Sequence, residues 1–324
     1  MTVVGIDIGG TKIAAALFTP AGEELFKESA RIAERQGREV GALAVELLGR
    51  AQQKASDAGL EIRAVGAIVP GIYYSGRGRV WAPNIPGWDD YPLLEELEAA
   101  VNGAIPVRVD SDRAGYILGE TWLGTARGCR NAVFVAVGTG IGAGILVDGR
   151  ILRGARDIAG ATGWLALDRP YRPGYREVGC FEYNASGPGI VRVARDRLHE
   201  DPGAPSILRE KEEDRITTAD VFAAADAGDP LARGVIDNAI EFWGMATANY
   251  VSLFDPEVII FGGGVFGPAA KYLDRIREEA LRWAQPISMP QVRLAVSSLG
   301  GDAGLFGAGH LALRALDTDT RSEG

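Results

Sequence analysis

Histidine, cysteine and methionine are scarce in this chain. Among its 324 residues, two are histidine, two are cysteine and three are methionine. Cys129 and Cys180 are too few to build a disulfide framework, so we expect both to be thiols in a reducing compartment. A Ser/His/Asp hydrolase needs a usable histidine, and both His199 and His310 fall in predicted helices. Disulfide-rich scaffolds and triad hydrolases are therefore disfavoured.

An excess of basic charge and long apolar runs are missing as well. The chain has 34 basic and 43 acidic residues, a net charge of −9, and no basic cluster, which argues against a nucleic-acid partner. It has no run of 18 apolar residues and no basic-then-apolar leader after Met1, so we expect neither a membrane span nor a signal peptide. The composition, 47% hydrophobic and 24% charged, is that of a globular protein, which we expect in the cytoplasm.

The chain begins with two short apolar runs around a pair of glycines. Residues 3–18 read VVGIDIGGTKIAAALF, which predicts a β-hairpin with a tight turn able to use positive φ. We call its tip the first glycine turn, and it consists of Gly9, Gly10, Thr11 and Lys12. Asp7 lies inside the first apolar run, where a buried carboxylate needs a partner such as a hydrated cation. A phosphate and Mg²⁺ site fits this pattern, and a structural turn capped by Asp7 is the alternative.

A second copy of the pattern follows about 130 residues later. Residues 132–147 read AVFVAVGTGIGAGILV, again two apolar runs around a turn. This second glycine turn consists of Gly138, Thr139, Gly140, Ile141 and Gly142. Its third glycine comes one residue too early for a dinucleotide fingerprint, and the chain has no Gly-Lys pair for a Walker loop. Two such units in one chain indicate a duplicated fold.

The segments GIDIGGTK and VGTGIGAGIL resemble the two phosphate segments of the sugar kinase, actin and Hsp70 superfamily. Within it, the chain from residue 2 to about residue 315 resembles the ROK family, which contains bacterial glucokinases, other hexose and hexosamine kinases and sugar-responsive repressors. The resemblance implies an α/β protein with the two-lobed ribonuclease H-like ATPase fold. It places a small lobe at residues 1–112, completed by a C-terminal helix at 302–316, and a large lobe at 113–301. We expect residues 317–324 to be a disordered tail.

The resemblance also implies ATP with Mg²⁺. The phosphates would lie between the two glycine turns, and Asp7 would hold the magnesium ion through water. Adenosine would lie near the glycine run that follows the predicted strand at 258–261, namely Gly262, Gly263 and Gly264. By itself a glycine run after a strand only indicates a close approach of backbone to a flat ligand.

A group of acids follows a predicted strand at residues 105–109. Asp110, Ser111 and Asp112 would lie at the carboxyl edge of a sheet, where α/β proteins bind ligands. The segment resembles the family's Asn-Asp-Ala-Asn motif, in which the Asp is the catalytic base. Asp112 matches that Asp, and Ser111 replaces the first Asn as a sugar contact. We expect the helix that follows to keep Asp112 ionised, and simple capping of that helix is the alternative.

A loop at residues 72–88 is rich in glycine, proline and aromatic residues. It contains WAPNIPGW at residues 81–88 and is read as loop throughout. The segment resembles the family's sugar-contacting loop, with Asn84 at the position of the asparagine that binds sugar hydroxyls. Without the resemblance, Asn84 would be read as a cap of a turn.

Residues 150–182 depart from the family pattern. The family's sugar-binding Glu is Ala161 here, and its His, which also binds a structural zinc, is Trp164. Only Cys180 remains of four zinc ligands, so we expect no zinc site. Glu182 stands where a carboxylate contacts the sugar. We expect Trp164 to fill the space of the missing metal, with stacking on a sugar face as the alternative.

Apolar positions at helical spacing predict three further helices. They cover residues 38–58, residues 184–198 with Asn184 as the cap, and residues 229–254. Residues 200–215 are charged and contain proline, which predicts an exposed excursion.

These features together predict an ATP-dependent kinase that phosphorylates a sugar hydroxyl, most simply the 6-hydroxyl of a hexose, as glucokinases do. An N-acetylhexosamine kinase, another sugar kinase or a catalytically weak sugar-binding protein are the alternatives. A ROK repressor would carry a DNA-binding domain before the first hairpin, whereas this sequence begins with the hairpin. We expect a small-molecule sugar as partner, no nucleic acid and no membrane, and a homodimer.

Overall fold

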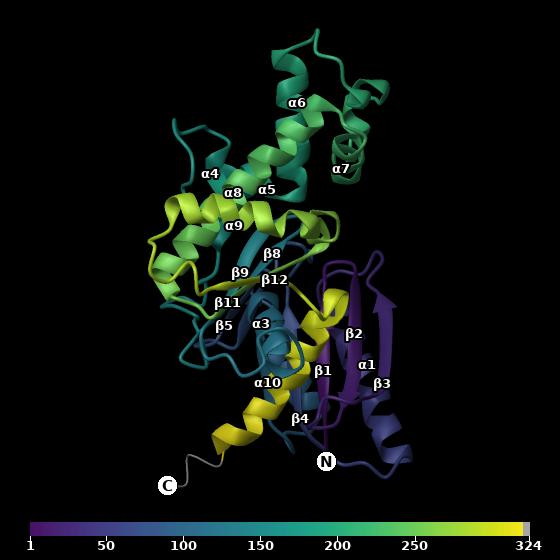
Figure 1. Ribbon diagram of the computed structural model, residues 1–324. Coiled ribbons are helices and arrows are strands. Elements are labelled where there is room, and N and C mark those ends of the chain that lie inside the picture. Colours follow the sequence, from purple (N-terminus) through teal and green to yellow (C-terminus); the bar gives the residue numbers. More distant parts are fainter. Residues whose placement is uncertain (320–324) are drawn as a thin grey trace. The chain divides into compact units, whose positions relative to one another are not determined.

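The structure is a computed structural model that describes residues 1–319, with side chains to residue 316. Two compact units emerge (Figure 1). The first comprises Met1–Gly128, Ile151–Ala159 and Ser297–Gly324, and the second comprises Cys129–Arg150 and Gly160–Val296. The predicted boundary near residue 112 differs from this division, because the helix that starts there belongs to the first unit. Helix α10 (Ala303–Asp319) includes residues 317–319 of the predicted tail, and residues 320–324 lie outside the described part.

The first unit is built on a five-stranded sheet in the order β3-β2-β1-β4-β7. Its strands are β1 (Thr2–Ile8), β2 (Lys12–Phe18), β3 (Glu24–Arg31), β4 (Ile62–Val69) and β7 (Val107–Ser111). β1 and β2 form the predicted antiparallel hairpin around the first glycine turn, and β4 and β7 join in parallel. The carboxyl ends of β1, β4 and β7 therefore meet at one edge of the sheet.

Helices cover both faces of this sheet, because nearly every residue of β1 and β4 is apolar and buried. α1 (Arg38–Asp57) and α2 (Leu93–Ala100) pack on one face, and α3 (Asp112–Trp122) and α10 on the other. α10 approaches the sheet closely where the strands carry glycine. A Cβ at Gly5 would lie 2.7 Å from the nitrogen of Gly309.

The second unit repeats this topology, with a sheet in the order β10-β9-β8-β11-β12. Its strands are β8 (Ala132–Val137), β9 (Ile141–Val147), β10 (Arg150–Ile151), β11 (Val258–Gly262) and β12 (Arg293–Val296). β8 and β9 form the second predicted hairpin, and β11 and β12 follow in parallel. The matching strand orders confirm the predicted duplication of the fold.

Six helices accompany the second sheet. They are α4 (Tyr175–Val178), α5 (Cys180–Ala185), α6 (Gly187–Glu200), α7 (Thr218–Asp226), α8 (Pro230–Phe254) and α9 (Leu273–Trp283). The short 3-10 helices in the described part of the chain are η1 (Thr162–Trp164), η2 (Ile207–Glu210), η3 (Glu213–Arg215), η4 (Gly264–Phe266), η5 (Pro268–Tyr272) and η6 (Gly300–Asp302). The long helix α8 is central to the hydrophobic core of this unit, and its Trp243 packs at 5.0 Å between ring centroids against Phe266.

Three predictions about local structure were wrong or incomplete. The segment 72–88 contains a small hairpin, β5 (Ile72–Tyr74) and β6 (Arg79–Trp81), where only loop was expected. Helix α7 was not predicted. Asn184 does not cap a helix, because it is buried in α5 and donates to the carbonyl of Cys180 at 2.9 Å. The cap of α6 is Ser186, whose hydroxyl accepts the N–H of Gly189 at 3.1 Å.

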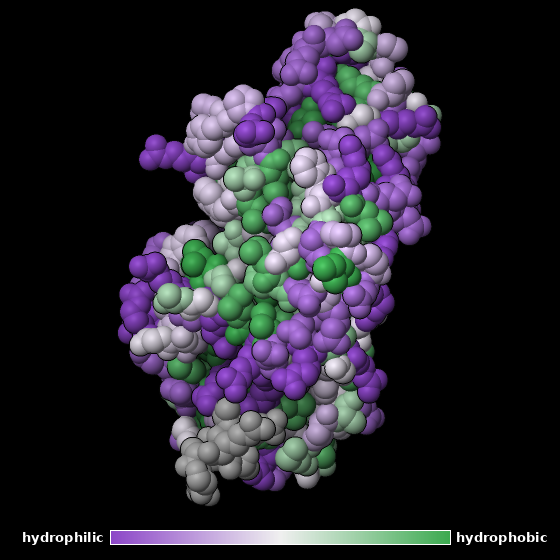
Figure 2. Space-filling model, turned by 60° about the vertical axis from the view of Figure 1, so that its left-hand side comes forward, coloured by the Kyte–Doolittle hydropathy of each residue, from purple (hydrophilic) through white to green (hydrophobic). Residues whose placement is uncertain are grey.

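Hydrophilic residues predominate on the face of the molecule that Figure 2 shows, with smaller hydrophobic areas among them. Several apolar side chains of the second unit are nevertheless exposed, among them Leu253, Trp283 and Ile287. Over the described residues, we find no helix with the length and apolar character needed to cross a membrane.

Candidate functional site

Asp7 lies near the carboxyl end of β1, beside the first glycine turn. A Cβ at Gly304, at the start of α10, would lie 2.7 Å from the Oδ2 atom of Asp7. Glycine at position 304 therefore leaves room for the Asp7 carboxylate. Burial raises the pKa of Asp7 to about 7, and repulsion by Asp112 and Asp302 acts in the same direction, whereas Lys12 opposes it. Negative charge from Asp112 and Asp302 thus acts on the Asp7 carboxylate, and a cation beside it would offset this charge.

The first glycine turn is closed by a hydrogen bond from the Gly9 N–H to the Lys12 carbonyl at 2.9 Å. The expected positive φ is not found at Gly9 or Gly10. Gly10 lies against the loop that carries Asn84, since a Cβ at Gly10 would be 3.4 Å from the Cβ of Asn84. The structure thereby brings together the predicted phosphate turn and the predicted sugar-contacting loop.

A cavity of about 220 Å³ opens at this meeting point. It is lined by Gly10, Ile32, Ala33, Glu34, Arg35, Gln36, Asn84, Ile85 and Pro86. The loop that follows β3, residues 33–36, was missed by sequence reasoning, because nothing in its polar sequence marks it as part of a site. Trp88 connects the two loops that line the cavity, since its indole N–H donates to the Gly37 carbonyl at 2.9 Å.

Ser111 and Asp112 lie where β7 ends and α3 begins. The buried Ser111 caps α3 by accepting the N–H of Ala114 at 3.4 Å. Asp112 is half-buried, and one of its oxygens accepts the N–H of Arg113 at 2.8 Å. Burial raises the pKa of Asp112 to about 6, although Arg113 and Tyr116 lower it. The helix was expected to favour ionisation, and desolvation outweighs it.

Asp110, the residue before this pair, was noted in the sequence but given no role. Its carboxylate is buried and paired with Arg153, and it also accepts the N–H of Ser111 at 2.9 Å. The segment Ile151–Ala159 is anchored a second time, because Asp157 accepts hydrogen bonds from the N–H and hydroxyl of Ser75 at 3.0 and 2.9 Å. Burial raises the pKa of Asp110, while its ion pair with Arg153 lowers it. Arg153 therefore helps fix the backbone immediately before Asp112.

In the second unit, the second glycine turn connects β8 and β9. The Gly138 N–H donates to the Gly140 carbonyl, and the Gly187 N–H at the start of α6 donates to the Gly138 carbonyl, both at 2.9 Å. A Cβ at Gly138 or at Gly264 would meet no atom within 4 Å. Glycine at these two positions is thus required neither by packing nor by positive φ, and the space in front of each remains open for a ligand.

The glycine segment 262–264 follows β11, which pairs with β8. Gly263 has φ of +87°, a conformation that side chains rarely adopt, and its Cα lies against the backbone of Val137. The segment thereby lies beside the strand that leads into the second glycine turn. The second glycine turn and the segment 262–264 thus lie together at one edge of this sheet, and both expose backbone with few side chains.

Glu182 on α5 contacts the second glycine turn. Its Oε2 atom accepts the N–H of Ile141 at 2.7 Å. Burial raises the pKa of Glu182, and the Ile141 N–H and Arg192 lower it. The residue that was predicted to contact a sugar thus also binds backbone of the predicted phosphate turn.

Trp164 does not fill an interior space, contrary to our expectation. Its side chain is 56% exposed, which leaves the ring available for stacking on a ligand. The neighbouring segment is held by other groups: the Tyr175 hydroxyl donates to Asp168 at 2.6 Å, and Asn184 donates to the Tyr175 oxygen at 3.3 Å. Among the side chains described, those of residues 1–316, no three His, Cys, Asp or Glu are grouped so as to hold a metal ion.

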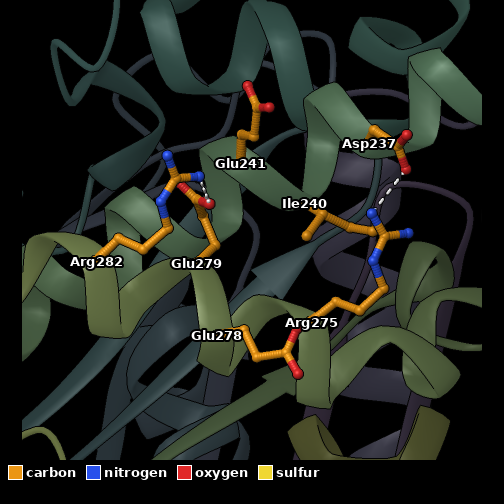
Figure 3. Close-up of a pocket in the computed structure, with 7 residues that line it drawn as sticks. All are labelled: Asp237, Ile240, Glu241, Arg275, Glu278, Glu279 and Arg282. Carbon is orange, nitrogen blue, oxygen red and sulfur yellow. Dashed lines mark hydrogen bonds and ion pairs between the residues drawn. The ribbon is translucent and has the colours of Figure 1, made fainter.

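A separate pocket of about 320 Å³ lies on the second unit between α8 and α9 (Figure 3). Its lining is mostly charged, with Asp237 paired to Arg275 at 2.8 Å and Glu279 paired to Arg282 at 2.7 Å. None of the residues that line it belongs to the predicted site. We therefore do not assign a ligand to it.

Known proteins resemble the chain over almost its whole length. Residues 3–315 match the ROK family. The sequence is 34% identical over 319 residues to a glucokinase of Halalkalibacterium halodurans, covering 95% of this chain and 94% of that protein. The structure is similar to a ROK hexokinase from Thermus thermophilus, with a TM-score of 0.80, 31% identity and coverage of 98% and 100%. It is also similar to a ROK glucokinase from Streptomyces griseus in complex with glucose and AMPPNP, with a TM-score of 0.74, 31% identity and coverage of 97% and 100%.

The chain belongs to the ROK family. Its two units have the two-lobed ribonuclease H-like ATPase fold of the sugar kinase, actin and Hsp70 superfamily, as the sequence predicted.

Proposed function

We propose that the protein is an ATP-dependent sugar kinase that transfers the γ-phosphoryl group of ATP to a hydroxyl of a hexose, as glucokinases do at the 6-hydroxyl. The observation that carries this proposal is Asp112, a half-buried carboxyl at the carboxyl end of β7 with a pKa raised to about 6. Such a carboxyl is ionised at neutral pH yet basic enough to accept a proton from an attacking hydroxyl. Related glucokinases and ROK hexokinases support the same reaction.

The first unit would bind the acceptor sugar. Asn84 lines the cavity beside the first glycine turn and has amide groups suited to sugar hydroxyls. Ser111 would contact the sugar next to Asp112, and Asp112 would take the proton of the attacking oxygen. The ion pair of Arg153 with Asp110 keeps the end of β7 in place for this step.

Both glycine turns would bind ATP through backbone N–H groups. In the first turn these would be the N–H groups of Gly10 and Thr11, with the Lys12 ammonium as a positive charge, while the Gly9 N–H closes the turn onto the Lys12 carbonyl. In the second turn they would belong to Thr139, Gly140 and Gly142, while Gly138, whose N–H donates to the Gly140 carbonyl, would contribute the space that its missing side chain leaves. The open space at Gly138 supports this assignment, because no protein atom competes for it. The adenosine would lie on Gly262, Gly263 and Gly264, where the backbone is bare.

Mg²⁺ fits the acidic surroundings of Asp7. The pKa of this carboxyl is raised by burial and by two neighbouring acids, and a cation would relieve both effects. One carboxylate acting through water suffices for a magnesium ion that is also held by phosphates. When bound, the ion would offset negative charge on the transferred group. The residues themselves would orient it and keep Asp112 free to accept the proton.

In the second unit, Glu182 and Trp164 are the residues that would contact the sugar. Glu182 offers a carboxylate, and the exposed ring of Trp164 offers a flat apolar face for stacking on a sugar. Ala161 provides no carboxylate. We propose that the segment works without zinc, because the hydrogen bonds of Tyr175 with Asp168 and Asn184 connect it internally.

A coupled ADP-release assay tests the function. Hexoses, hexosamines, N-acetylhexosamines and sugar acids are offered with ATP and Mg²⁺, with Asp112→Asn as the matched inactive control. We expect glucose-like hexoses to give the highest kcat/KM and the control to give background rates. ADP release that is independent of every sugar, or equal in the control, would contradict the proposal.

A catalytically weak sugar-binding protein is the second candidate. It is favoured by Ala161 and Trp164, which remove two polar groups from the site that the family resemblance implies. Calorimetric binding of a sugar without any turnover by wild-type protein would identify it. The presence of Asp112 favours the enzyme, since binding alone does not require a base.

We propose a homodimer that uses the exposed apolar side chains at the C-terminal ends of α8 and α9. Leu253, Trp283 and Ile287 are between 62% and 76% exposed. Sedimentation equilibrium of wild-type protein and of Trp283→Ser tests this, because a monomer in both cases would contradict it.

We propose that the enzyme works in the cytoplasm, where ATP is available and where its two free cysteines remain reduced. Its net charge of −9 makes nucleic acid an unsuitable partner.

A further inference from the structure

Glu182 is the side chain through which α5 reaches the second glycine turn. Its Oε2 atom accepts the N–H of Ile141, the first residue of β9, at 2.7 Å. The two residues are 41 positions apart in the chain, so this hydrogen bond connects separate elements of the second unit. Bonds from an N–H to an ionised carboxylate are among the stronger ones in proteins.

Two glycines make room for this carboxylate. A Cβ at Gly140 would lie 2.8 Å from Glu182 Oε2, and a Cβ at Gly163 would lie 2.9 Å from the same atom. Gly140 belongs to the turn, whereas Gly163 belongs to η1. The carboxylate is thus enclosed on two sides, and the position of Oε2 depends on the absence of two side chains.

The second glycine turn is held at both of its ends. Gly138 is fixed through its carbonyl by the N–H of Gly187, and Ile141 is fixed through its N–H by Glu182. Apart from these two hydrogen bonds, the turn has little packing at Gly138, where a Cβ would meet nothing within 4 Å. Glycine-rich backbone is flexible unless such contacts restrain it.

We propose that Glu182 is a positioning residue that holds the second glycine turn in the form that binds phosphate. The inference rests on the proposed function, in which the amides of this turn bind ATP. Nucleotide affinity then depends on a side chain that need not touch the nucleotide.

The binding test uses the full-length protein and AMPPNP with Mg²⁺, in the absence of any sugar. We expect Glu182→Ala to weaken binding by about tenfold or more, the effect of a lost hydrogen bond to a charged group. Glu182→Gln keeps an oxygen that can accept the Ile141 N–H, so it should bind AMPPNP nearly as wild type does. Gly163→Ala should also weaken binding, because its methyl group would lie 2.9 Å from both Glu182 Oε2 and the Ile141 carbonyl oxygen and so would disturb the contact from both sides.

Glu177→Ala is the matched control, because Glu177 is exposed on the neighbouring helix α4. This variant should leave the affinity for AMPPNP unchanged. A melting curve of each variant should first establish that it is folded at the temperature of the binding measurement. A Glu182→Ala variant that is folded and binds AMPPNP as wild type does would overturn the inference. So would a Glu182→Gln variant as weak as Glu182→Ala, because charge and not the hydrogen bond would then matter.

Hydrogen exchange provides a readout that does not need the nucleotide. Peptides that cover residues 138–142 should exchange faster in Glu182→Ala and Gly163→Ala than in wild type, Glu182→Gln or Glu177→Ala. If wild type does not bind AMPPNP but the exchange pattern holds, the proposed function fails while the tie between Glu182 and the turn remains. If exchange is unchanged in Glu182→Ala, the positioning role is disproved whatever the nucleotide result.

Discussion

The two sheets share one topology, yet their carboxyl edges are equipped in opposite ways. In the first unit, titratable side chains gather beside β1 and β7, and burial raises the pKa of Asp7 to about 7 and of Asp112 to about 6. In the second unit, the corresponding edge is mostly bare backbone, with open space at Gly138 and Gly264. The two units therefore share a fold but differ at this edge: the first carries ionisable side chains, and the second leaves open space beside its glycines.

This difference separates two kinds of sensitivity to mutation. Changes at the charged edge should affect the rate or its pH dependence while leaving the space for ligands intact. Changes at the glycine edge should affect binding while leaving proton transfer intact. Variants at each edge test that separation.

Asp112→Asn should lower kcat by about 10²–10⁴-fold, the usual contribution of a general base. The amide has nearly the same shape as the carboxylate, so the affinities for sugar and AMPPNP should change little. Steady-state kinetics together with calorimetry of both ligands measures the two effects. Near-normal turnover in this variant would mean that another group accepts the proton.

Gly138→Val should weaken AMPPNP binding by more than about tenfold, because its side chain would occupy the space that phosphates need. The free protein should tolerate the change, since a Cβ at this position meets no atom within 4 Å. The melting temperature should therefore stay close to that of wild type. Unchanged affinity in a folded variant would remove the phosphate assignment from this turn.

Ala161→Glu should sharpen the choice of sugar. Wild type should distinguish poorly between hexoses that differ only in configuration at carbon 2, because Ala161 offers no acceptor. One hydrogen bond to a charged group is equivalent to about 1.5–3 kcal/mol, or a factor of roughly ten or more in kcat/KM. If the wild-type enzyme already discriminates strongly between such epimers, a residue other than Ala161 must contact the substituent at carbon 2 of the sugar.

Asp7→Asn should stabilise the metal-free protein at pH 8. The pKa of Asp7 is about 7 in the folded chain and near 3.8 when unfolded, so between these values the folded state alone keeps the proton. Stability therefore falls as pH rises through this window, and the asparagine variant lacks this loss. We expect its melting temperature to exceed that of wild type by several degrees at pH 8 in chelator. The difference should vanish near pH 4, and a difference independent of pH would contradict this assignment.

Removal of zinc should change nothing. Elemental analysis of the purified protein should find no stoichiometric zinc, and a melting curve at constant Mg²⁺ should be the same with and without a zinc chelator. Tyr175→Phe is the matched variant, because it removes the hydrogen bonds to Asp168 and Asn184 and should lower the melting temperature instead. Bound zinc would mean that the segment 159–182 is aligned incorrectly, and the role of Glu182 would need to be reconsidered.

The hairpins and their turns could be predicted from sequence because their signals are local. Apolar runs around a glycine turn define β1 with β2 and β8 with β9 without reference to the rest of the chain. Asp7 and Asp112 could be found for a similar reason, since an acid within or directly after an apolar strand is conspicuous.

The parts of the site that were missed depend on contacts between distant residues. Arg153 and Asp110 are 43 positions apart, and Glu182 and Ile141 are 41 apart, so no short window contains either pair. The loop at residues 33–36 became part of a cavity only because Asn84 folds back beside Gly10. Trp164 was misjudged because aromatic bulk in a sequence does not reveal whether the ring points inward.

The return of the last helix to the first sheet has a consequence for how the chain folds as it leaves the ribosome. α10 covers a face of the sheet that β1, β2 and β4 form, and Val3, Phe18 and Ala64 pack against it. The strands made first thus cannot bury all of that face until residues 303–319 have been synthesised, whereas residues 129–150 and 160–296 of the second unit can fold earlier. During translation the apolar surface of the N-terminal half is exposed to water for the longest time. A chain that stops before α10 would present this surface permanently, which makes premature termination near residue 300 a route to aggregation rather than to a shortened enzyme.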